Sequence, residues 1–200
     1  MQAYTFGEPI RTPRLVLRPF VPEDLDALHA IYGDPGVHRW LYSVAHTPEQ
    51  TRASLDKKMA RRAVADDGDG LSLAACLAAG GDLIADVSLW CTSATDSQAE
   101  IGYTVHPRHQ GHGYAAEACA PLLAIAFDAI GMHRVAGRLE ARNAASARVL
   151  EKLGMRREAH LVENEWVKGE WQSEVVYAIL DSEWRASARS CAADRLPGTP

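Results

Sequence analysis

A short glycine-containing turn between an apolar strand and a helix constrains this chain of 200 residues more than any other feature. The turn has the sequence Arg108-His109-Gln110-Gly111-His112-Gly113, and the strand before it ends at Val105. The first N–H groups of a helix have no partner within the helix and point outward with the positive end of the helix dipole. The two glycines remove β-carbons that would keep a bulky anion away from these amides. The turn therefore predicts a diphosphate site, with Arg108 as an added cation.

Two other interpretations of this turn have to be weighed. One is an ordinary glycine-rich connection that binds nothing. The other is a dinucleotide site, because Gly111-x-Gly113-x-x-Ala116 satisfies that fingerprint and Glu140 follows as a possible ribose-binding acid. The dinucleotide fingerprint begins directly on the first strand of a parallel unit, whereas Pro107 to Gln110 intervene here and short hairpins join the preceding strands. The sequence therefore favours another carrier of a diphosphate.

The periodicity of apolar residues predicts one domain in which strands and helices are mixed. We expect strands at 14–18, 71–77, 83–90, 100–105, 133–140, 156–162 and 173–180, and helices at 23–32, 47–65, 111–130 and 143–153. Thr47 and Pro48 are typical of a helix start, and Gly131 of a helix end. Residues 1–9 are expected to be an N-terminal extension, 10–184 the domain, and 185–200 a disordered tail.

Composition and charge argue against several classes of protein. The formal net charge is −5 and no run of basic residues stands out, so we expect no nucleic-acid partner. No segment approaches the roughly 18 apolar residues of a membrane span, and the first residues lack a secretion signal, so we expect a cytoplasmic protein without a membrane partner. The four cysteines are widely spaced, and His106, His109 and His112 lie around a turn, so we expect no metal.

The turn resembles the cofactor motif of the GNAT acetyltransferase superfamily, which is Gln or Arg, two residues, Gly, one residue, and Gly or Ala. Three further segments narrow the resemblance to the RimJ/RimL-like branch: Thr12-Pro13-Arg14-Leu15-Val16-Leu17-Arg18, Glu100-Ile101-Gly102-Tyr103, and Asn143-Ala144-Ala145-Ser146 ahead of Leu153-Gly154-Met155. The similarity covers residues 10 to 184. It implies an α/β (α+β) fold, with a mixed, mostly antiparallel central sheet of about seven strands that is split between the fourth and fifth strands and flanked by helices.

The resemblance also implies an acyl-CoA-dependent N-acetyltransferase. Acetyl would pass from acetyl-CoA, bound in the split, to a primary amine by direct attack in a ternary complex. The acceptor would be a protein N-terminal α-amine or a small-molecule amine, and the protein a monomer or a homodimer. The cofactor-binding residues that the resemblance implies are Tyr103, Thr104, Val105, Arg108, Gln110, Gly111, His112, Gly113, Tyr114, Ala115, Asn143 and Ser146.

Two residues are candidates for proton transfer. Glu100 matches a position where related enzymes often place a base, and it either removes the amine proton or only orients the amine. Ser146 lies one helical turn after Asn143 and is the best available donor to the departing thiolate, a step for which many relatives use a tyrosine. Trp40, Tyr42, Glu100 and Trp166 are the expected acceptor-binding residues. Two alternatives stay open: a module that binds acyl-CoA without turnover, and transfer of another acyl group such as succinyl.

Overall fold

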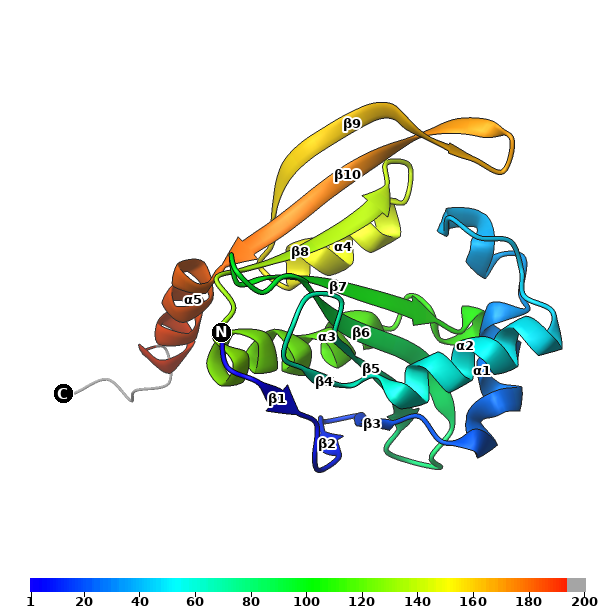
Figure 1. Cartoon of the computed structure of the whole chain (residues 1–200), viewed down its shortest axis with the longest axis horizontal. Helices are drawn as coiled ribbons and strands as arrows, with labels where there is room; N and C mark the ends of the chain where they lie inside the picture. The colour runs from blue at the N-terminus through cyan, green and yellow to red at the C-terminus, as the bar shows by residue number, and fades with distance from the viewer. Residues whose placement is uncertain (194–200) are drawn as a thin grey trace.

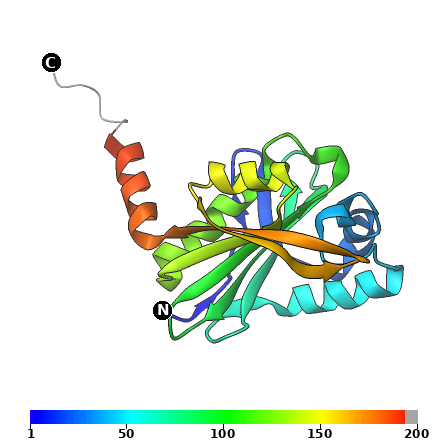
Figure 2. The same cartoon turned by 90° about the horizontal axis from the view of Figure 1, so that it is seen from above.

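The computed structural model describes residues 1–193, which form one mixed β-sheet with helices on both faces (Figures 1 and 2). In chain order the strands are β1 Tyr4–Thr5, β2 Ile10–Arg11, β3 Leu15–Pro19, β4 Arg62–Val64, β5 Gly70–Leu77, β6 Leu83–Ser93, β7 Gln98–Val105, β8 Arg134–Glu140, β9 Arg156–Val167 and β10 Glu170–Leu180. The α-helices are α1 Leu25–Tyr32, α2 Pro48–Ala60, α3 Tyr114–Ala124, α4 Ala144–Lys152 and α5 Asp181–Ala193. Short 3-10 helices are η1 Pro22–Asp24, η2 Val37–Trp40 and η3 Pro107–His109, and the π-helix η4 is Ile125–Ile130.

The sheet is mostly antiparallel, as expected. Its order is β1-β4-β5-β6-β7-β8-β10-β9, and β3 pairs with both β2 and β5. The pair β7–β8 is parallel, and the other pairs of this order are antiparallel. The sheet has ten strands within residues 1–193 where about seven were expected, because β1, β2 and β4 are pieces of two or three residues that carry no alternating pattern. The predicted fold is confirmed.

The central strand β5 explains why helices cover both faces of the sheet. Leu71, Leu73 and Ala75 pack into a cluster with α3, whereas Ala74 and Cys76 pack on the opposite face with residues of α1 and α2. Successive side chains of a strand point to opposite faces, so an apolar run needs a cover on each side. Figure 2 accordingly has α3 and α4 above the sheet and α2 below it.

Helix α2 begins as predicted but ends earlier than predicted. Thr47 caps it by accepting a hydrogen bond from the Gln50 N–H at 3.3 Å, and the Gln50 side chain accepts one from the Thr47 N–H at 2.8 Å. The expected helix to about residue 65 is wrong, because the chain leaves the helix at Arg61 and continues as β4. Val64 is fully buried in that strand, so burial in the sheet overrides the local helical preference.

Residues 1–9 and 185–193 both contain regular secondary structure. Residues 1–9, expected to be an extension, place β1 beside β4 and bury Phe6. Residues 185–193, expected to be part of a disordered tail, continue α5, while the rest of that tail, 194–200, lies outside the described residues. The Trp184 ring stacks on Phe127 at 5.7 Å between centroids and its Nε1 donates to Asp128 at 3.2 Å, which docks the helix. Phe127 and Trp184 are far apart in the sequence, so no local pattern predicts this contact.

Three other helices and the last hairpin follow the predicted positions with shifted ends. The helix expected over 111–130 starts at Tyr114, becomes a π-helix at Ile125, and ends at Gly131 with φ 77°. The strands expected to end at Val162 and to start at Ser173 instead run to Val167 and from Glu170, so that Lys168 and Gly169 form the turn between them. Among the helices of residues 1–193, none has the length and apolar character needed to cross a bilayer.

Candidate active site

The sheet opens between β7 and β8, which pair only at their first residues. The parallel pairs are Gln98 with Arg134, Ala99 with Val135, and Glu100 with Ala136. Beyond them β7 continues beside β6 and β8 continues beside β10, so the two strands diverge (Figure 1). A cleft of about 670 Å³ lies between them. The backbone groups of β7 that face this cleft have no neighbouring strand and are available to a ligand that carries amides. The predicted split is confirmed.

The glycine turn closes one end of the cleft. Gln110 ties the turn to the end of β7, because its Nε2 donates to the Val105 carbonyl at 3.0 Å. Gly111 and Gly113 have φ values of 80° and 82°, a left-handed conformation that glycine adopts without strain. A β-carbon on Gly111 would meet no protein atom within 4 Å, so space is open above the turn. Helix α3 then starts at Tyr114 with its first N–H groups directed at this space. The geometry fits a diphosphate.

A polar clamp fixes this turn to the start of the domain. Arg14 pairs with Glu117 of α3 at 2.6 Å and donates to the His112 carbonyl at 3.0 Å, and its guanidinium lies 4.5 Å from the centre of the Tyr114 ring. Thr12 donates to the other Glu117 oxygen at 2.6 Å. Desolvation alone would raise the pKa of Glu117, but the hydrogen bonds from Thr12 and Arg14 outweigh it and lower the pKa. The opening motif of the domain thus has a physical role that sequence reasoning had not assigned.

Most of the predicted cofactor-binding residues line the cleft. They are Tyr103, Thr104, Val105, Gln110, Gly111, Gly113, Tyr114, Ala115, Asn143 and Ser146. Arg108 and His112 do not line it: Arg108 is exposed on η3, and His112 is exposed with its Nδ1 at 2.8 Å from the Gln110 carbonyl. The turn directs these two side chains outward because it presents its backbone to the cleft. The basic side chains that line the cleft near α4 are Arg148 and Lys152, which sequence reasoning missed although their spacing of four places them on one helix face.

Ser146 lies against a tyrosine that the sequence did not connect with it. Its Oγ is 2.7 Å from the Tyr103 hydroxyl, which also contacts the Ser146 carbonyl at 3.0 Å. Asn143 caps α4 by accepting a hydrogen bond from the Ser146 N–H at 3.1 Å. Burial raises the pKa of Tyr103, so its phenol stays protonated. A pair of hydroxyl groups, rather than a lone serine, therefore lies beside the split.

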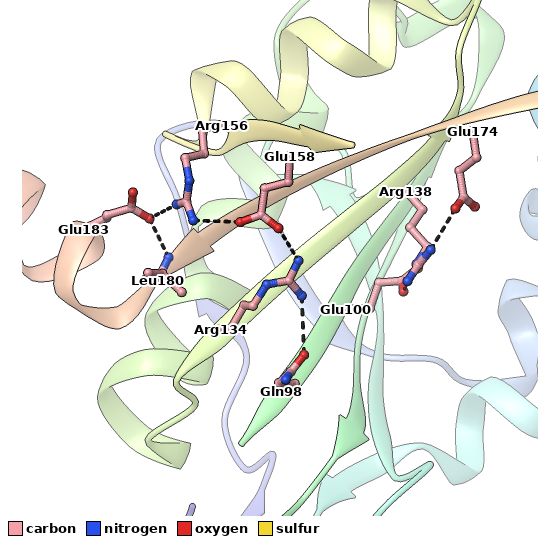
Figure 3. Close-up of polar contacts among 9 residues, drawn as sticks. All are labelled: Gln98, Glu100, Arg134, Arg138, Arg156, Glu158, Glu174, Leu180 and Glu183. Carbon is pink, nitrogen blue, oxygen red and sulfur yellow. Dashed lines mark hydrogen bonds and ion pairs between the residues drawn. The ribbon is translucent and has the colours of Figure 1, made fainter. Parts of the chain in front are cut away.

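Glu100 lies on β7, at the point where the split begins, in an ion-pair network. The Nε of Arg138 is 3.1 Å from a Glu100 oxygen, and its Nη1 is 2.7 Å from a Glu174 oxygen (Figure 3). The second Glu174 oxygen accepts from the Tyr42 hydroxyl at 3.0 Å. Burial raises the pKa of Glu100, although the Arg138 charge acts in the opposite direction. A carboxylate with a raised pKa at the edge of a cleft is suited to accept a proton from an amine.

The expected acceptor-binding residues divide into two groups. Trp40, Tyr42 and Glu100 line the cleft, whereas Trp166 does not. Trp166 is 60% exposed near the tip of the β9–β10 hairpin, where it packs edge to face on Trp171 at 5.4 Å between centroids. The two strands extend further than predicted and carry this pair beyond the cleft, so the placement of Trp166 in the acceptor wall is not supported.

A buried polar cluster in the cleft was missed altogether. Lys58 of α2 pairs with Asp86 of β6 at 2.6 Å, and the Tyr32 hydroxyl donates to the same Asp86 oxygen at 2.6 Å. Burial alone would lower the pKa of Lys58, but Asp86 outweighs it and raises the pKa. The signal was present, because Asp86 is the one charged residue in the strand from Leu83 to Trp90 and a buried charge needs a partner. Among residues 1–193, no three His, Cys, Asp or Glu side chains form a metal-binding cluster.

Comparisons with known proteins agree with this geometry. Residues 14–156 match the family model described as an acetyltransferase (GNAT) domain. The chain is 29% identical over 175 residues to a Bacillus subtilis protein named uncharacterized N-acetyltransferase YnaD, covering 88% of this chain and 98% of that protein. It is 31% identical over 104 residues to the Bacillus subtilis putative ribosomal N-acetyltransferase YdaF, covering 52% of this chain and 57% of that protein.

Among solved structures, a GNAT acetyltransferase from Bacillus anthracis superposes with a TM-score of 0.78 at 28% identity. The superposition covers 88% of this chain and 99% of that one. The family match spans the split sheet, the glycine turn and Ser146, the features on which the geometric argument depends. The chain therefore belongs to the GNAT family of acetyltransferases, and its acyl donor is acetyl-CoA.

Proposed function

We propose that the chain transfers acetyl to a primary amine by direct attack within a ternary complex. The acceptor is either the α-amine of a protein N-terminus or the amine of a small molecule. The observation that carries this proposal is the position of Glu100 at the last residue pair before β7 and β8 separate. The amine would reach the reacting carbon from the side of Glu100, Trp40 and Tyr42, opposite the Tyr103–Ser146 pair. The partial match to YdaF, named a putative ribosomal N-acetyltransferase, supports a RimJ/RimL-like acceptor.

Each wall of the cleft has a separate task in the proposed reaction. Acetyl-CoA, when bound, supplies an activated thioester carbonyl and a thiolate leaving group. Backbone N–H groups from Gly113 to Ala115 hold the diphosphate. Glu100 takes a proton from the attacking amine, directly or through water, and the Ser146 hydroxyl, supported by Tyr103, donates a hydrogen bond or a proton to the leaving sulfur. Glu100 would then act as a base rather than only orienting the amine.

Charge on the acceptor wall favours a cationic acceptor. Away from α4, the lining carries the carboxylates of Asp86, Glu100 and Glu174 against the cations Lys58 and Arg138, which leaves one negative charge in that part, while Arg148 and Lys152 line the cleft on α4. An α-amine, with a reference pKa of about 7.7–8.0, is partly neutral near pH 7, whereas a lysine amine at about 10.4 demands a stronger base. One carboxylate that is ion-paired with an arginine therefore suits an α-amine or a small amine of lowered pKa.

The test is a panel of acceptors incubated with isotope-labelled acetyl-CoA, followed by mass spectrometry of the acceptors and by thiol release. The panel should contain peptides with free N-termini, peptides with blocked N-termini and a free lysine, and polyamines. We expect acetylation of free α-amines or small amines, and loss of most turnover in Glu100→Gln with unchanged coenzyme A affinity.

Two results would contradict the proposal. Coenzyme A binding without turnover on any acceptor would instead favour the binding module, and a preference for succinyl-CoA over acetyl-CoA would favour another acyl group. Acetylation of blocked peptides on lysine alone would overturn the proposed acceptor class.

A further inference from the structure

A series of polar contacts joins four segments on the side of the cleft where we place the acceptor. It runs from the Tyr42 hydroxyl to Glu174 of β10, from Glu174 to Arg138 of β8, and from Arg138 to Glu100 of β7. Figure 3 has the Arg138 side chain between the two carboxylates, reaching across from its own strand. Arg138 comes two residues after Ala136, the last residue of β8 paired with β7. The contact with Glu100 therefore bridges the two strands where they diverge.

Glu174 is held in place independently of Arg138. Its side chain is only 8% exposed, and one of its oxygens accepts the Tyr42 hydroxyl. The strand pairing between β10 and β9 shifts register between Gln172 and Glu174, and the Glu174 N–H donates to the Asn164 side chain at 3.1 Å. A buried carboxylate that accepts a hydrogen bond from Tyr42, on a backbone held by Asn164, has little freedom to move toward Arg138, so the Arg138 side chain reaches toward Glu174.

The geometry divides one guanidinium unevenly between two carboxylates. An arginine can engage a single carboxylate through two parallel hydrogen bonds. Here Arg138 gives its Nη1 to Glu174 at 2.7 Å and leaves the longer Nε contact of 3.1 Å for Glu100. Glu100 thus keeps one oxygen without a hydrogen bond to Arg138.

We propose that Glu174 is a positioning residue for acetyl transfer: it holds the Arg138 guanidinium and so prevents Arg138 from engaging both oxygens of Glu100. This inference rests on the proposed role of Glu100 as the base. A proton leaves the amine nitrogen for the oxygen of Glu100 that Arg138 does not occupy, while the nitrogen lone pair forms the bond to the acetyl carbon and the thiolate leaves. Without Glu174 that oxygen would be taken by the guanidinium, and Glu100 would be a weaker base.

The other charges near Glu100 do not substitute for Glu174. Arg134, from β8, is paired with Glu158 at 2.5 Å and with Gln98, and it acts on Glu100 only at a distance. Trp90, opposite Glu100 on β6, is uncharged. Among the described groups the pKa of Glu100 therefore depends first on burial, which raises it, then on Arg138, which lowers it, and last on the opposed charges of Glu174 and Arg134.

The experiment is a carbon-13 NMR titration of labelled glutamate carboxyl groups in the full chain without coenzyme or acceptor, with the Glu100 signal assigned from Glu100→Gln. Glu174→Gln keeps the shape of the side chain but loses its charge, so we expect the Glu100 pKa to fall by about one pH unit, since a close opposite charge lowers a carboxyl pKa by roughly that amount or more. Arg138→Met should move the same pKa upward. Glu170→Gln, on the same hairpin but paired with Arg142, is the matched control and should leave it unchanged.

Kinetics with the best acceptor complete the test. We expect Glu174→Gln to lower kcat about tenfold or more, and to move the acid limb of the pH profile of kcat to lower pH, together with the Glu100 pKa. Glu174→Asp should restore part of kcat and part of the shift of the acid limb. An unchanged Glu100 pKa in folded Glu174→Gln, or a lower kcat with an unshifted pH profile, overturns the positioning role. The Glu100 pKa can shift as expected in Glu174→Gln while the unmutated protein acetylates no amine. That result would support the contact by which Glu174 positions Arg138, and it would contradict the proposed function.

Discussion

At the scale of single residues, Gly111 and Gly131 have the same backbone conformation in different surroundings. Their φ values are 80° and 77°, and a β-carbon on either would meet no protein atom within 4 Å. Gly111 lines the cleft, whereas Gly131 ends the helix that follows α3. Conformational strain and ligand exclusion can therefore be separated by the same substitution at the two positions.

We expect Gly111→Ala and Gly131→Ala to lower the free energy of unfolding by a similar amount, about 1 kcal/mol, because a left-handed conformation costs an alanine that much. Only Gly111→Ala should weaken coenzyme A binding, by about tenfold, since its methyl group would occupy the space above the turn. Chemical denaturation and titration calorimetry measure the two quantities. Equal coenzyme affinity in both variants would contradict the location of the diphosphate.

At the scale of elements, Glu117 joins the start of α3 to the segment before β3. Its pKa is lowered in the folded protein, so it contributes stability that is fully present above its unfolded pKa of about 4.3 and is lost as the pH falls through the lower folded pKa. Glu117→Gln should therefore cost about 1–2 kcal/mol at pH 7 through its weakened hydrogen bonds, and this deficit should shrink toward pH 3.

Denaturation midpoints of the Glu117→Gln variant and the unmutated chain at pH 7 and pH 3 measure this difference. The exposed Glu23, in η1, provides the control, since Glu23→Gln should change stability by less than about 0.5 kcal/mol at either pH. A deficit for Glu117→Gln that stays constant between the two pH values would exclude an ionic contribution from the clamp.

The elements that the sequence predicted well are those with local signals. Thr47 and Pro48 marked the start of α2, Gly131 marked the end of the helix after the turn, and alternation or apolar runs located β3 and β5 to β8. The elements that it predicted badly depend on distant partners. Residues 62–64 become a strand because β1 and β5 flank them, and α5 forms where Trp184 docks on Phe127.

The candidate site divides in the same way. The glycine turn could be recognised because its chemistry lies within six consecutive residues, 108–113. The pairs Tyr103–Ser146 and Lys58–Asp86 join residues that are far apart in sequence, so the sequence around one residue does not predict its partner. The charge of Arg108 favours a role in binding a diphosphate, but the direction of a side chain in a turn depends on backbone angles that the sequence pattern does not give.

At the scale of the whole molecule, the β9–β10 hairpin extends past the body of the sheet (Figure 1) and carries Trp166 away from the cleft. We expect Trp166→Ala to leave the acceptor KM within about twofold, whereas Trp40→Ala, which removes a large side chain from the cleft wall, should raise it about tenfold. Steady-state kinetics with the best acceptor measure both. A large rise in KM for Trp166→Ala would return this residue to the acceptor site.

The short junction between β7 and β8 gives the molecule a sheet edge in its interior. Exposed edges are normally a hazard, because they invite strands of other proteins to pair and aggregate. This edge lies instead between the walls of a cleft, where a strand that belongs to another sheet has no room to enter. A narrow ligand that carries its own amide groups can enter. Unpaired backbone groups that would pair with any strand at an outer edge therefore bind only such a ligand at this inner edge.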